Sequence, residues 1–334
     1  MIVTFGEMLM RLSPPGYERF AQARQYDCWF GGAEGNTAVL LAQLGRAARP
    51  VTVLPANPIG CACRAELMRF GVDTTQIRMD ESPEARMGLY FCEQGGSQRP
   101  SRVIYDRAGS AFARARHNDF HWDEILDGAD WFHFTGITPA LGPELAAAAL
   151  DGCRTAKRQG MRVSCDLNYR ASLWSREQAR AIMPSYLEYT DLLFANAGSI
   201  FDTLGFGGRE NIPEATLDAA KAVRAQYRIP NIALTMRESL SASQNAWSAM
   251  LLDPDGREFW SKRYVIDIID RIGGGDSFAA GMIDAVCENR GGQYAVEFAA
   301  AASCLKHTIP GDFNLVTREE IRQLMDSDTM CIER

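Results

Sequence analysis

The sequence predicts an α/β fold, a three-layer αβα sandwich with a mostly parallel central sheet and a small β-sheet lid. Strand-like and helix-like segments alternate along most of the 334 residues, and repeated βαβ units form parallel sheets with helices on both faces. Residues 10–30 and 86–108 break this alternation. No low-complexity linker or fixed-period repeat occurs, so we expect residues 1–334 to form one domain into which these two segments insert as the lid.

The core strands are predicted from short apolar runs that precede segments of helical periodicity. Residues 2–5 form the first such run, and the helix that follows it ends at Gly45. Strand-like segments recur at residues 51–54, 130–136, 161–168, 191–196 and 231–236. The helix-like segments between them are residues 63–71, 144–160, 175–189 and 213–227, with a short helix after Asn196. This order is typical of a parallel sheet.

Residues 86–108 predict two antiparallel strands, because a turn with Gly95, Gly96 and Pro100 joins two strand-like runs without a crossover helix. A small lid of this kind exposes apolar residues and open strand edges, which proteins usually cover. We therefore expect the lid to pair with a second chain, as a homodimer or larger homo-oligomer. The apolar residues behind this expectation are Tyr90, Phe91, Val103, Ile104 and Tyr105.

Composition and charge exclude several classes of protein. The net charge of −7 disfavours binding to nucleic acid or to an anionic membrane. No apolar run approaches the roughly 18 residues of a membrane span, and the N-terminus does not resemble a signal peptide. The nine cysteines include no C-x-x-C pair, which favours reduced thiols in a cytoplasmic protein. His117 and His121 lack an obvious third ligand, so we expect no metal site there.

The motif that bears most on function is IGGGDSFAAG, in which Gly273, Gly274 and Gly275 precede Asp276 at a predicted strand-to-helix turn. Glycines let the backbone approach a ligand, and the N–H groups of a helix N-terminus attract anions. Asp276 is expected at the N-cap or beside it. It either caps the helix only or also serves as an acid/base carboxylate beside an anion hole. No G-K-[ST] follows, so the motif is not a P-loop.

Two further motifs lie where open α/β sheets bind ligands. Gly32 and Asn36 stand at the start of the first predicted helix. Asp166, Asn168 and Arg170 follow a predicted strand at alternate positions, at the carboxyl edge of the sheet. Arg170 either binds a carboxylate or phosphate in a bidentate manner or forms a surface salt bridge.

Taken together, these motifs resemble the ribokinase-like (PfkB) family of carbohydrate kinases, and within it the 2-keto-3-deoxygluconate kinases. The resemblance covers nearly the whole chain, with the motifs in the order of the family. They are FGEMLMRLSP, GGAEGN, residues 57–74, GLYF, VIYDRAGSA, GITPAL, DLNYRASLW and DRIGGGDSFAAG. The last is this chain's form of the D-T-x-G-A-G-D signature, with Gly274 in place of Ala.

The resemblance implies transfer of the γ-phosphoryl group of ATP, with Mg²⁺, to a hydroxyl of a sugar acid. It implies that Asp276 is the base and that the backbone of Gly273 to Gly275 forms the anion hole. The residues implied in sugar binding are Gly32, Asn36, Tyr90, Tyr105, Arg107, Ile137 and Arg170. Those implied on the nucleotide side are Asn168, Asn196, Thr235, Arg237, Ala301 and Cys304. Many members have N-x-x-E where this chain has Asn196 and Ser199, so the ligands of Mg²⁺ are not assigned.

Other functions remain as alternatives. A kinase of a neutral sugar such as fructose would not need the two cations Arg107 and Arg170, although one arginine serving ATP and the other pairing with Asp106 or Glu93 would also account for them. Ser199 in place of Glu suggests a non-catalytic sugar-binding protein, whereas Asp276 and its glycines argue against one. A dinucleotide-dependent dehydrogenase is disfavoured because no glycine-rich turn follows the first strand.

Overall fold

The computed structural model describes residues 1–326, and it has a mostly parallel central sheet. Nine strands follow one another in the order β13-β12-β11-β10-β9-β8-β1-β4-β5, and β14 also pairs with β12. The strands from β11 to β5 are parallel, whereas β12 is antiparallel to its three neighbours. The ten strands of the central sheet are β1 (Ile2–Phe5), β4 (Ala48–Pro55), β5 (Ile77–Asp80), β8 (Trp131–Thr135), β9 (Arg162–Asp166), β10 (Leu192–Ala195), β11 (Asn231–Ser239), β12 (Gln244–Leu252), β13 (Glu258–Trp260) and β14 (Tyr264–Asp267).

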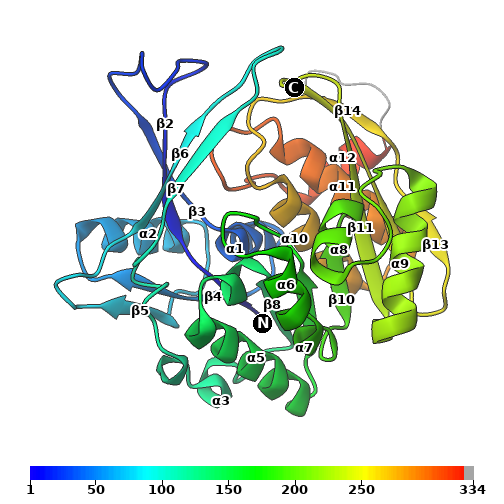
Figure 1. The fold of residues 1–334 in the computed structure, drawn as a ribbon, viewed down its shortest axis with the longest axis horizontal. Helices are drawn as coiled ribbons and strands as arrows, with labels where there is room; N and C mark the ends of the chain where they lie inside the picture. The colour runs from blue at the N-terminus through cyan, green and yellow to red at the C-terminus, as the bar shows by residue number, and fades with distance from the viewer. Residues whose placement is uncertain (327–334) are drawn as a thin grey trace.

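Helices cover both faces of this sheet, which confirms the predicted three-layer fold (Figure 1). One face packs against α1 (Ala33–Gln43), α2 (Pro58–Arg69), α10 (Gly274–Glu288), α11 (Gly292–Lys306) and α12 (Arg318–Asp326). The other packs against α3 (Trp122–Ile125), α4 (Ile137–Ala140), α5 (Pro143–Arg158), α6 (Arg176–Ile182), α7 (Pro184–Leu187), α8 (Ala197–Leu204) and α9 (Pro213–Tyr227). A short 3₁₀ turn, His117–Asp119, precedes α3.

The largest departure from the sequence-based boundaries is in one helix, and α2 also begins earlier than expected, at Pro58 rather than at residue 63. Residues 175–189 were expected to form one helix, but α6 ends at Ile182 and α7 begins at Pro184. Proline lacks the N–H that a continuing helix needs, so it serves as the first residue of a new turn. The predicted helix over residues 213–227 is confirmed as α9.

A second, four-stranded sheet is separate from the central sheet and forms the lid in the upper left of Figure 1. Its order is β3-β2-β6-β7, and β6 and β7 pair antiparallel as the sequence predicts. One unexpected pairing joins β2 and β6 in parallel, which fuses the two inserted segments into one sheet. The strands are β2 (Leu9–Ser13), β3 (Asp27–Gly31), β6 (Gly88–Glu93) and β7 (Arg102–Asp106).

Small side chains bring α10 and α11 together. A Cβ atom on Gly281 would come 3.1 Å from the Cα of Ala299 and 3.2 Å from the Cβ of Ala302, so a larger residue there would force the helices apart. The antiparallel pair places the N-terminus of α10 beside the C-terminus of α11, where the Ser303 hydroxyl donates to the Gly274 carbonyl at 2.8 Å. The glycine-rich turn is therefore supported from behind by a second helix.

Other expectations concern metals, thiols and membranes. Within residues 1–326 no helix is both long and apolar enough to cross a bilayer. The eight cysteines in this range are free thiols, and Cys331 lies outside the described residues. The imidazole of His117 lies 2.6 Å from Asp151, and the described part of the chain has no cluster of metal-ligating side chains.

Candidate active site

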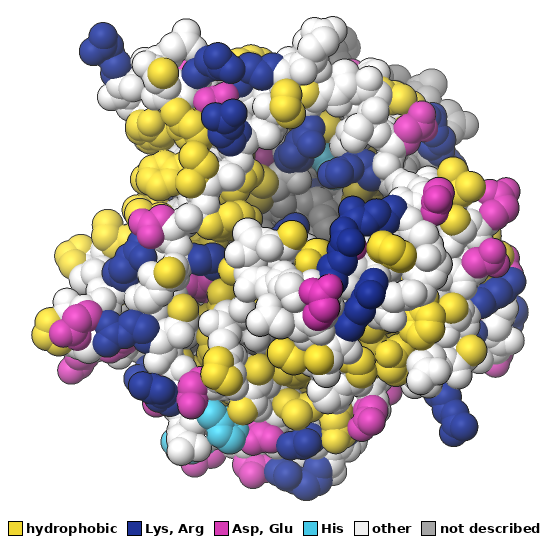
Figure 2. All heavy atoms as spheres, in the orientation of Figure 1, with side chains coloured by type: hydrophobic (Ala, Val, Ile, Leu, Met, Phe, Trp, Pro, Cys, Tyr) yellow, Lys and Arg dark blue, Asp and Glu magenta, His cyan; other side chains and the backbone are white. Residues whose placement is uncertain are grey.

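A cavity of about 670 Å³ lies between the lid and the carboxyl ends of the central strands. Its lining comes from β11, from the residues that follow β1, β8, β9 and β10, from the start of α10, and from lid residues Tyr90 and Tyr105. Figure 2 shows the hollow with Lys and Arg side chains around its rim. Open α/β sheets bind ligands at this edge, and mixed polar and apolar concavities of this size hold small molecules.

The glycine run begins α10 at the wall of this cavity. Gly273 is the N-cap residue and has φ 84°, a left-handed conformation that glycine adopts without strain. A Cβ atom there would also collide with the Asp312 carbonyl, so no other residue fits. Gly274, Gly275 and Asp276 form the first turn, whose N–H groups have no partner within the helix. Asp276 is thus the third residue of α10 rather than its N-cap, and capping does not explain it.

Asp276 is a half-buried carboxyl group that borders the cavity. Burial raises its pKa to about 6, against the hydrogen bond from Asn36 and the charge of Arg170, which lower it. The Asn36 amide donates to Oδ2 of Asp276 at 2.7 Å, and Oδ1 of Asn36 accepts the Gly32 N–H at 3.3 Å. The amide therefore fixes one carboxylate oxygen and leaves the other for a ligand. A pKa near neutrality suits a proton acceptor.

Two other acids lie near Asp276, the half-buried Asp166 and the buried Glu34. Burial and the charge of Asp276 raise the pKa of Asp166 to about 7, although its carboxylate accepts the Asn168 N–H at 3.0 Å. Burial also raises the pKa of Glu34 to about 7, and this side chain accepts the Thr135 N–H at 2.9 Å. Because these carboxyl groups repel one another when ionised, the site favours a cation or a proton donor from a ligand.

The residues predicted to bind sugar all border the cavity: Gly32, Asn36, Tyr90, Tyr105, Arg107, Ile137 and Arg170. Arg107 is held by Glu7, which accepts its Nε–H at 2.7 Å and also contacts Nη2. The alternative partners were wrong, since Asp106 pairs with Arg86 and Glu93 with Arg99. Nη1 of Arg107 is not part of the ion pair with Glu7, so the guanidinium keeps an edge for a ligand.

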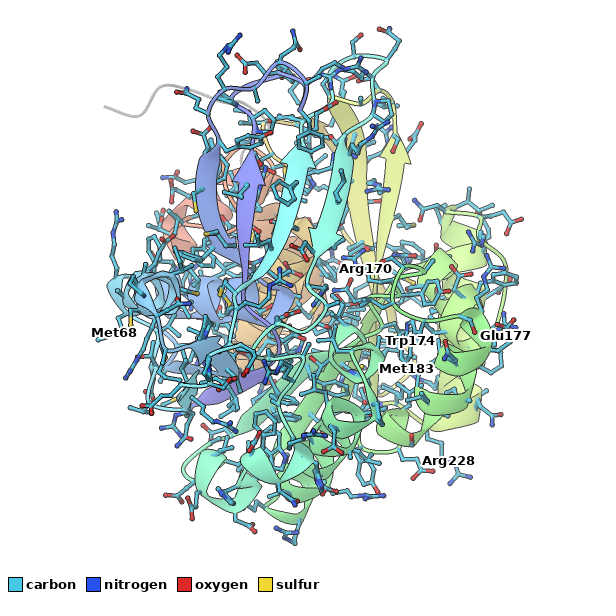
Figure 3. The ribbon with its side chains drawn as sticks, turned by 60° about the vertical axis from the view of Figure 1, so that its left-hand side comes forward. Met68, Arg170, Trp174, Glu177, Met183 and Arg228 are labelled. Carbon is cyan, nitrogen blue, oxygen red and sulfur yellow. The ribbon has the colours of Figure 1, made fainter. Side chains whose placement is uncertain are left out.

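Arg170 lies beneath the lid strands in Figure 3. Within residues 1–326 it forms no salt bridge, so the surface ion pair that the sequence left open is not observed. Its charge lowers the pKa of both Asp166 and Asp276. A cation that borders a cavity without a protein partner is available to an anionic ligand.

The residues predicted on the nucleotide side divide into two groups. Asn168, Asn196, Thr235 and Arg237 border the cavity. Ala301 and Cys304 do not, because the antiparallel strands β12 and β13 and helix α10 pack against α11. Ala301 is fully buried in the core, and Cys304 packs in a cluster with Trp247, Ile266 and Ile268.

Ser199 occupies the third position of α8 and has a structural role. Its N–H donates to Oδ1 of Asn196 at 2.9 Å, and its hydroxyl accepts the Asn196 N–H at 2.9 Å. This reciprocal pair is a capping box, which orders the start of the helix. The box leaves Ser199 without the charge that a glutamate would bring to the cavity.

Several lining residues were missed by the sequence analysis: Glu7, Asp202, Arg209, Asn211, Trp247, Arg271 and Asp312. Arg271 immediately precedes the Ile-Gly-Gly-Gly motif, so its position was a usable signal. Arg209 and Asn211 lie in a loop without any periodicity, and tertiary contacts bring them to the cavity. Arg209 pairs with Asp202 at 2.5 Å, and the Asn211 amide donates to the Arg237 carbonyl.

The match with known proteins covers nearly the whole chain. Residues 1–316 fit the model of the pfkB family carbohydrate kinases. The chain belongs to this family. Among curated members, a 2-dehydro-3-deoxygalactonokinase of Haloferax volcanii is 32% identical, over 100% of this chain and 99% of that protein. A 2-dehydro-3-deoxygluconokinase of Bacillus subtilis is 25% identical, over 97% and 95%.

The pfkB fold is also evident from a solved structure. The crystal structure of a 2-dehydro-3-deoxygluconokinase from Thermotoga maritima is 48% identical and covers 98% of both chains, with a TM-score of 0.94. The fold and the carbohydrate kinase class that the sequence predicted are thereby confirmed.

The raised pKa of Asp276 predicts that this group destabilises the protein. Between the unfolded pKa near 3.8 and the folded pKa of about 6, the native state binds a proton that the unfolded state has lost, so stability falls as the pH rises. Asp276→Asn should therefore increase the free energy of unfolding at pH 8 by on the order of 1–3 kcal/mol, and much less at pH 4. Urea unfolding at both pH values measures this.

The control for that measurement is Asp218→Asn, at an exposed position on α9. It should change stability little at either pH. If Asp276→Asn is no more stable than the wild type at pH 8, burial does not oppose ionisation of this carboxyl group as described.

Proposed function

We propose that this protein transfers the γ-phosphoryl group of ATP to a hydroxyl of a sugar acid, with 2-keto-3-deoxygluconate the first candidate and 2-keto-3-deoxy-6-phosphogluconate its product. The observation that carries this proposal is the position of Asp276 in the first turn of α10, in the same cavity as Arg107 and Arg170. The relatives named above act on 2-dehydro-3-deoxy sugar acids of the gluco and galacto series. Both epimers therefore belong in the test.

In this proposal Asp276 accepts the proton of the attacking hydroxyl. Asn36 holds Oδ2, which leaves Oδ1 to receive the proton. The first-turn N–H groups of α10 bind the oxygens of the transferred phosphate, where negative charge accumulates as the bond to the leaving group breaks. Phosphoryl transfer depends mainly on such positioning and charge stabilisation, so the arrangement needs no covalent intermediate.

The two arginines favour a sugar acid over a neutral sugar. Arg107 is nearly buried, with a side chain 10% exposed, and Glu7 neutralises it from one side. Arg170 has no ion-pair partner within residues 1–326. Placing a guanidinium against a neutral sugar loses hydration without a compensating charge, whereas a carboxylate accepts paired hydrogen bonds from it. The neutral-sugar alternative therefore lacks a use for the charge of Arg170.

The residues around the cavity also fit Mg²⁺ bound with a nucleotide. Mg²⁺ usually keeps several waters and binds through one or two carboxylates plus substrate phosphates, so it needs no cage of protein ligands. Asp166 and Asp276 both border the cavity and raise each other's energy when ionised, and a divalent cation relieves that repulsion. We assign Asp166 as the first candidate to hold the ion or its waters. Bound there, Mg²⁺ would neutralise phosphate charge during transfer.

The ATP phosphates are assigned to the basic side of the cavity. Arg209, Arg237 and Arg271 border it on the side of Asn196 and Thr235. The chain has no P-loop lysine, so we assign the phosphate charge to these guanidinium groups and the α10 N-terminus. The Arg271 guanidinium donates to the Ala242 carbonyl at 2.6 Å, which fixes its direction beside the glycine turn.

The lid is proposed to pair with the lid of a second copy of this chain. Along β7 every residue is exposed, including Val103, Ile104 and Tyr105. Hydrophobic side chains gather on the outer side of the lid in Figure 2. Tyr90 and Phe91 contribute less than expected, because Tyr90 is buried and donates to Asp312, while Phe91 contacts Phe20 and Tyr26.

The activity is tested by a coupled assay of ADP release. We expect turnover with 2-keto-3-deoxygluconate or its galacto epimer, slower turnover with fructose and ribose, and loss of activity in excess chelator. Asp276→Asn should keep the fold and lower kcat by roughly 10²–10⁴, the range for a positioned base. If Asp276→Asn keeps more than half of kcat, Asp276 is not the base.

Substrate choice is tested by Arg107→Ala. The variant should raise KM for the sugar acid and barely change KM for ATP, because the guanidinium binds the carboxylate. The loss in kcat/KM should amount to about 1.5–3 kcal/mol, the value of a hydrogen bond to a charged group. Arg102→Ala, at an exposed position on β7 that does not border the cavity, is the control. Efficient phosphorylation of fructose or ribose above any sugar acid would contradict the assignment.

Association through the lid is tested by sedimentation at micromolar concentration. The wild type should sediment as a dimer or larger assembly, and Ile104→Arg should dissociate it because a charge replaces an apolar contact. Val265→Arg places the same charge at an exposed valine on β14, outside the lid sheet, and should not change the mass. A monomeric wild type would contradict this proposal.

A further inference from the structure

Lys306 is a fully buried lysine at the end of α11, and the mechanism described above does not use it. A lysine is almost never buried in this way unless its charge is compensated. Its ammonium donates to the Ile309 carbonyl at 2.8 Å and forms no salt bridge among the described residues. Desolvating this ammonium costs free energy, so its burial indicates that Lys306 has a functional role.

The lysine stem packs directly under the glycine turn. A Cβ atom on Gly273 would come 3.3 Å from Cε of Lys306, and one on Gly274 would come 2.6 Å from the ring of His307. Ser303 binds the Gly274 carbonyl one turn earlier in α11. The C-terminal turn of α11 therefore supports the glycine turn from behind. The N–H groups of the glycine turn face the cavity.

The charges around Lys306 connect it to the site. Burial lowers the pKa of Lys306, the charges of Asp270, Asp312 and Asp276 raise it in part, and the charge of Arg11 lowers it further. Arg11 pairs with Asp270 at 2.7 Å and with Asp312 at 3.2 Å, so two carboxylates face two cations behind the turn. His307 is neutral at physiological pH, since burial lowers its pKa to about 4. Lys306 thus completes the charge balance.

The same charge reaches the proposed base. Lys306 is one of the groups that lower the pKa of Asp276, together with Asn36 and Arg170, while Asp312 raises it. Lys306 does not border the cavity, so it acts through the turn and through Asp276 rather than by touching a ligand.

We propose that Lys306 is a built-in cation of the phosphate-binding turn, a positioning residue that holds Gly273 to Gly275 from behind and supports negative charge on the cavity side. The inference rests on the proposed phosphoryl transfer. In this inference the ammonium of Lys306 acts as a bound cation would, and Asp270, Asp312 and the Ile309 carbonyl surround it.

The first test compares Lys306→Met with the wild type. Methionine keeps most of the volume and removes the charge. We expect kcat to fall roughly 100-fold, as for loss of a group that stabilises transition-state charge, while KM for the sugar acid changes less than about threefold. The acidic limb of the kcat–pH profile should move to higher pH, because the pKa of Asp276 rises when the ammonium is lost.

The second test is chemical rescue, which a purely structural role of Lys306 would not produce. In Lys306→Ala, added propylammonium should restore part of kcat in a saturable manner, whereas n-propanol, which has the same size and no charge, should not. Lys306→Met should not respond, since its side chain fills the space. Lys221→Met is the matched control: this exposed lysine pairs with Glu258 on the surface at 2.9 Å and should keep full activity.

The test of Lys306 does not depend on which sugar is the substrate. If the wild type phosphorylates a different sugar, the same comparison is made with that sugar. Lys306→Met with wild-type kcat and pH profile would overturn the inference and leave the proposed function intact. If the variants are too unstable for assay, or if no sugar is turned over, thermal unfolding of Lys306→Ala decides. A rise in Tm with propylammonium but not with propanol supports the cation site, and no difference contradicts it.

Discussion

The turn at Gly273 is the constraint on which the site depends. Its φ of 84° lies in the left-handed region, and the Asp312 carbonyl occupies the space that a side chain would need. This conformation fixes where α10 begins and therefore where its free N–H groups point. It also places Asp276 three residues into the helix, beside Asn36 of α1 and within the cavity. The close packing of α10 on α11 fixes the turn against the central sheet.

Around that turn the protein maintains an unusual density of buried charge. Asp276, Asp166 and Glu34 have raised pKa values because burial disfavours their ionised forms. Such groups lower stability and are retained where chemistry needs them. The cations that offset these carboxylates lie in two places. Lys306 lies behind the turn, and Arg107 and Arg170 lie at the cavity. Ligand binding then supplies the remaining charges, a carboxylate for the arginines and a metal–nucleotide complex for the acids.

Much of the fold was predictable because its signals are local and periodic. Short apolar runs and the helical spacing of residues 213–227 need no knowledge of distant partners. The same holds for the Gly273–Asp276 motif, whose turn chemistry lies within a few residues. Gly32, Asn36 and Arg170 were also found from local patterns and lie in one cavity.

Features that depend on contacts between distant residues were not predictable. Glu7 and Arg107 are 100 positions apart in the sequence, and Arg11 meets partners 259 and 301 positions away. Ala301 and Cys304 were assigned to the nucleotide side from the family resemblance, and the sequence does not reveal that β12, β13 and α10 pack against α11. Arg209 reaches the cavity from a loop whose path no periodic pattern encodes.

The measurement that tests the central claim most directly is a crystal structure of Asp276→Asn with 2-keto-3-deoxygluconate and a non-hydrolysable ATP analogue. The account predicts that a terminal sugar hydroxyl lies within hydrogen-bond distance of the residue 276 side chain, that the γ-phosphate meets the first-turn N–H groups of α10, and that the sugar carboxylate faces Arg107 and Arg170. A sugar bound with its carboxylate away from both arginines, or a γ-phosphate remote from the glycine turn, would contradict it.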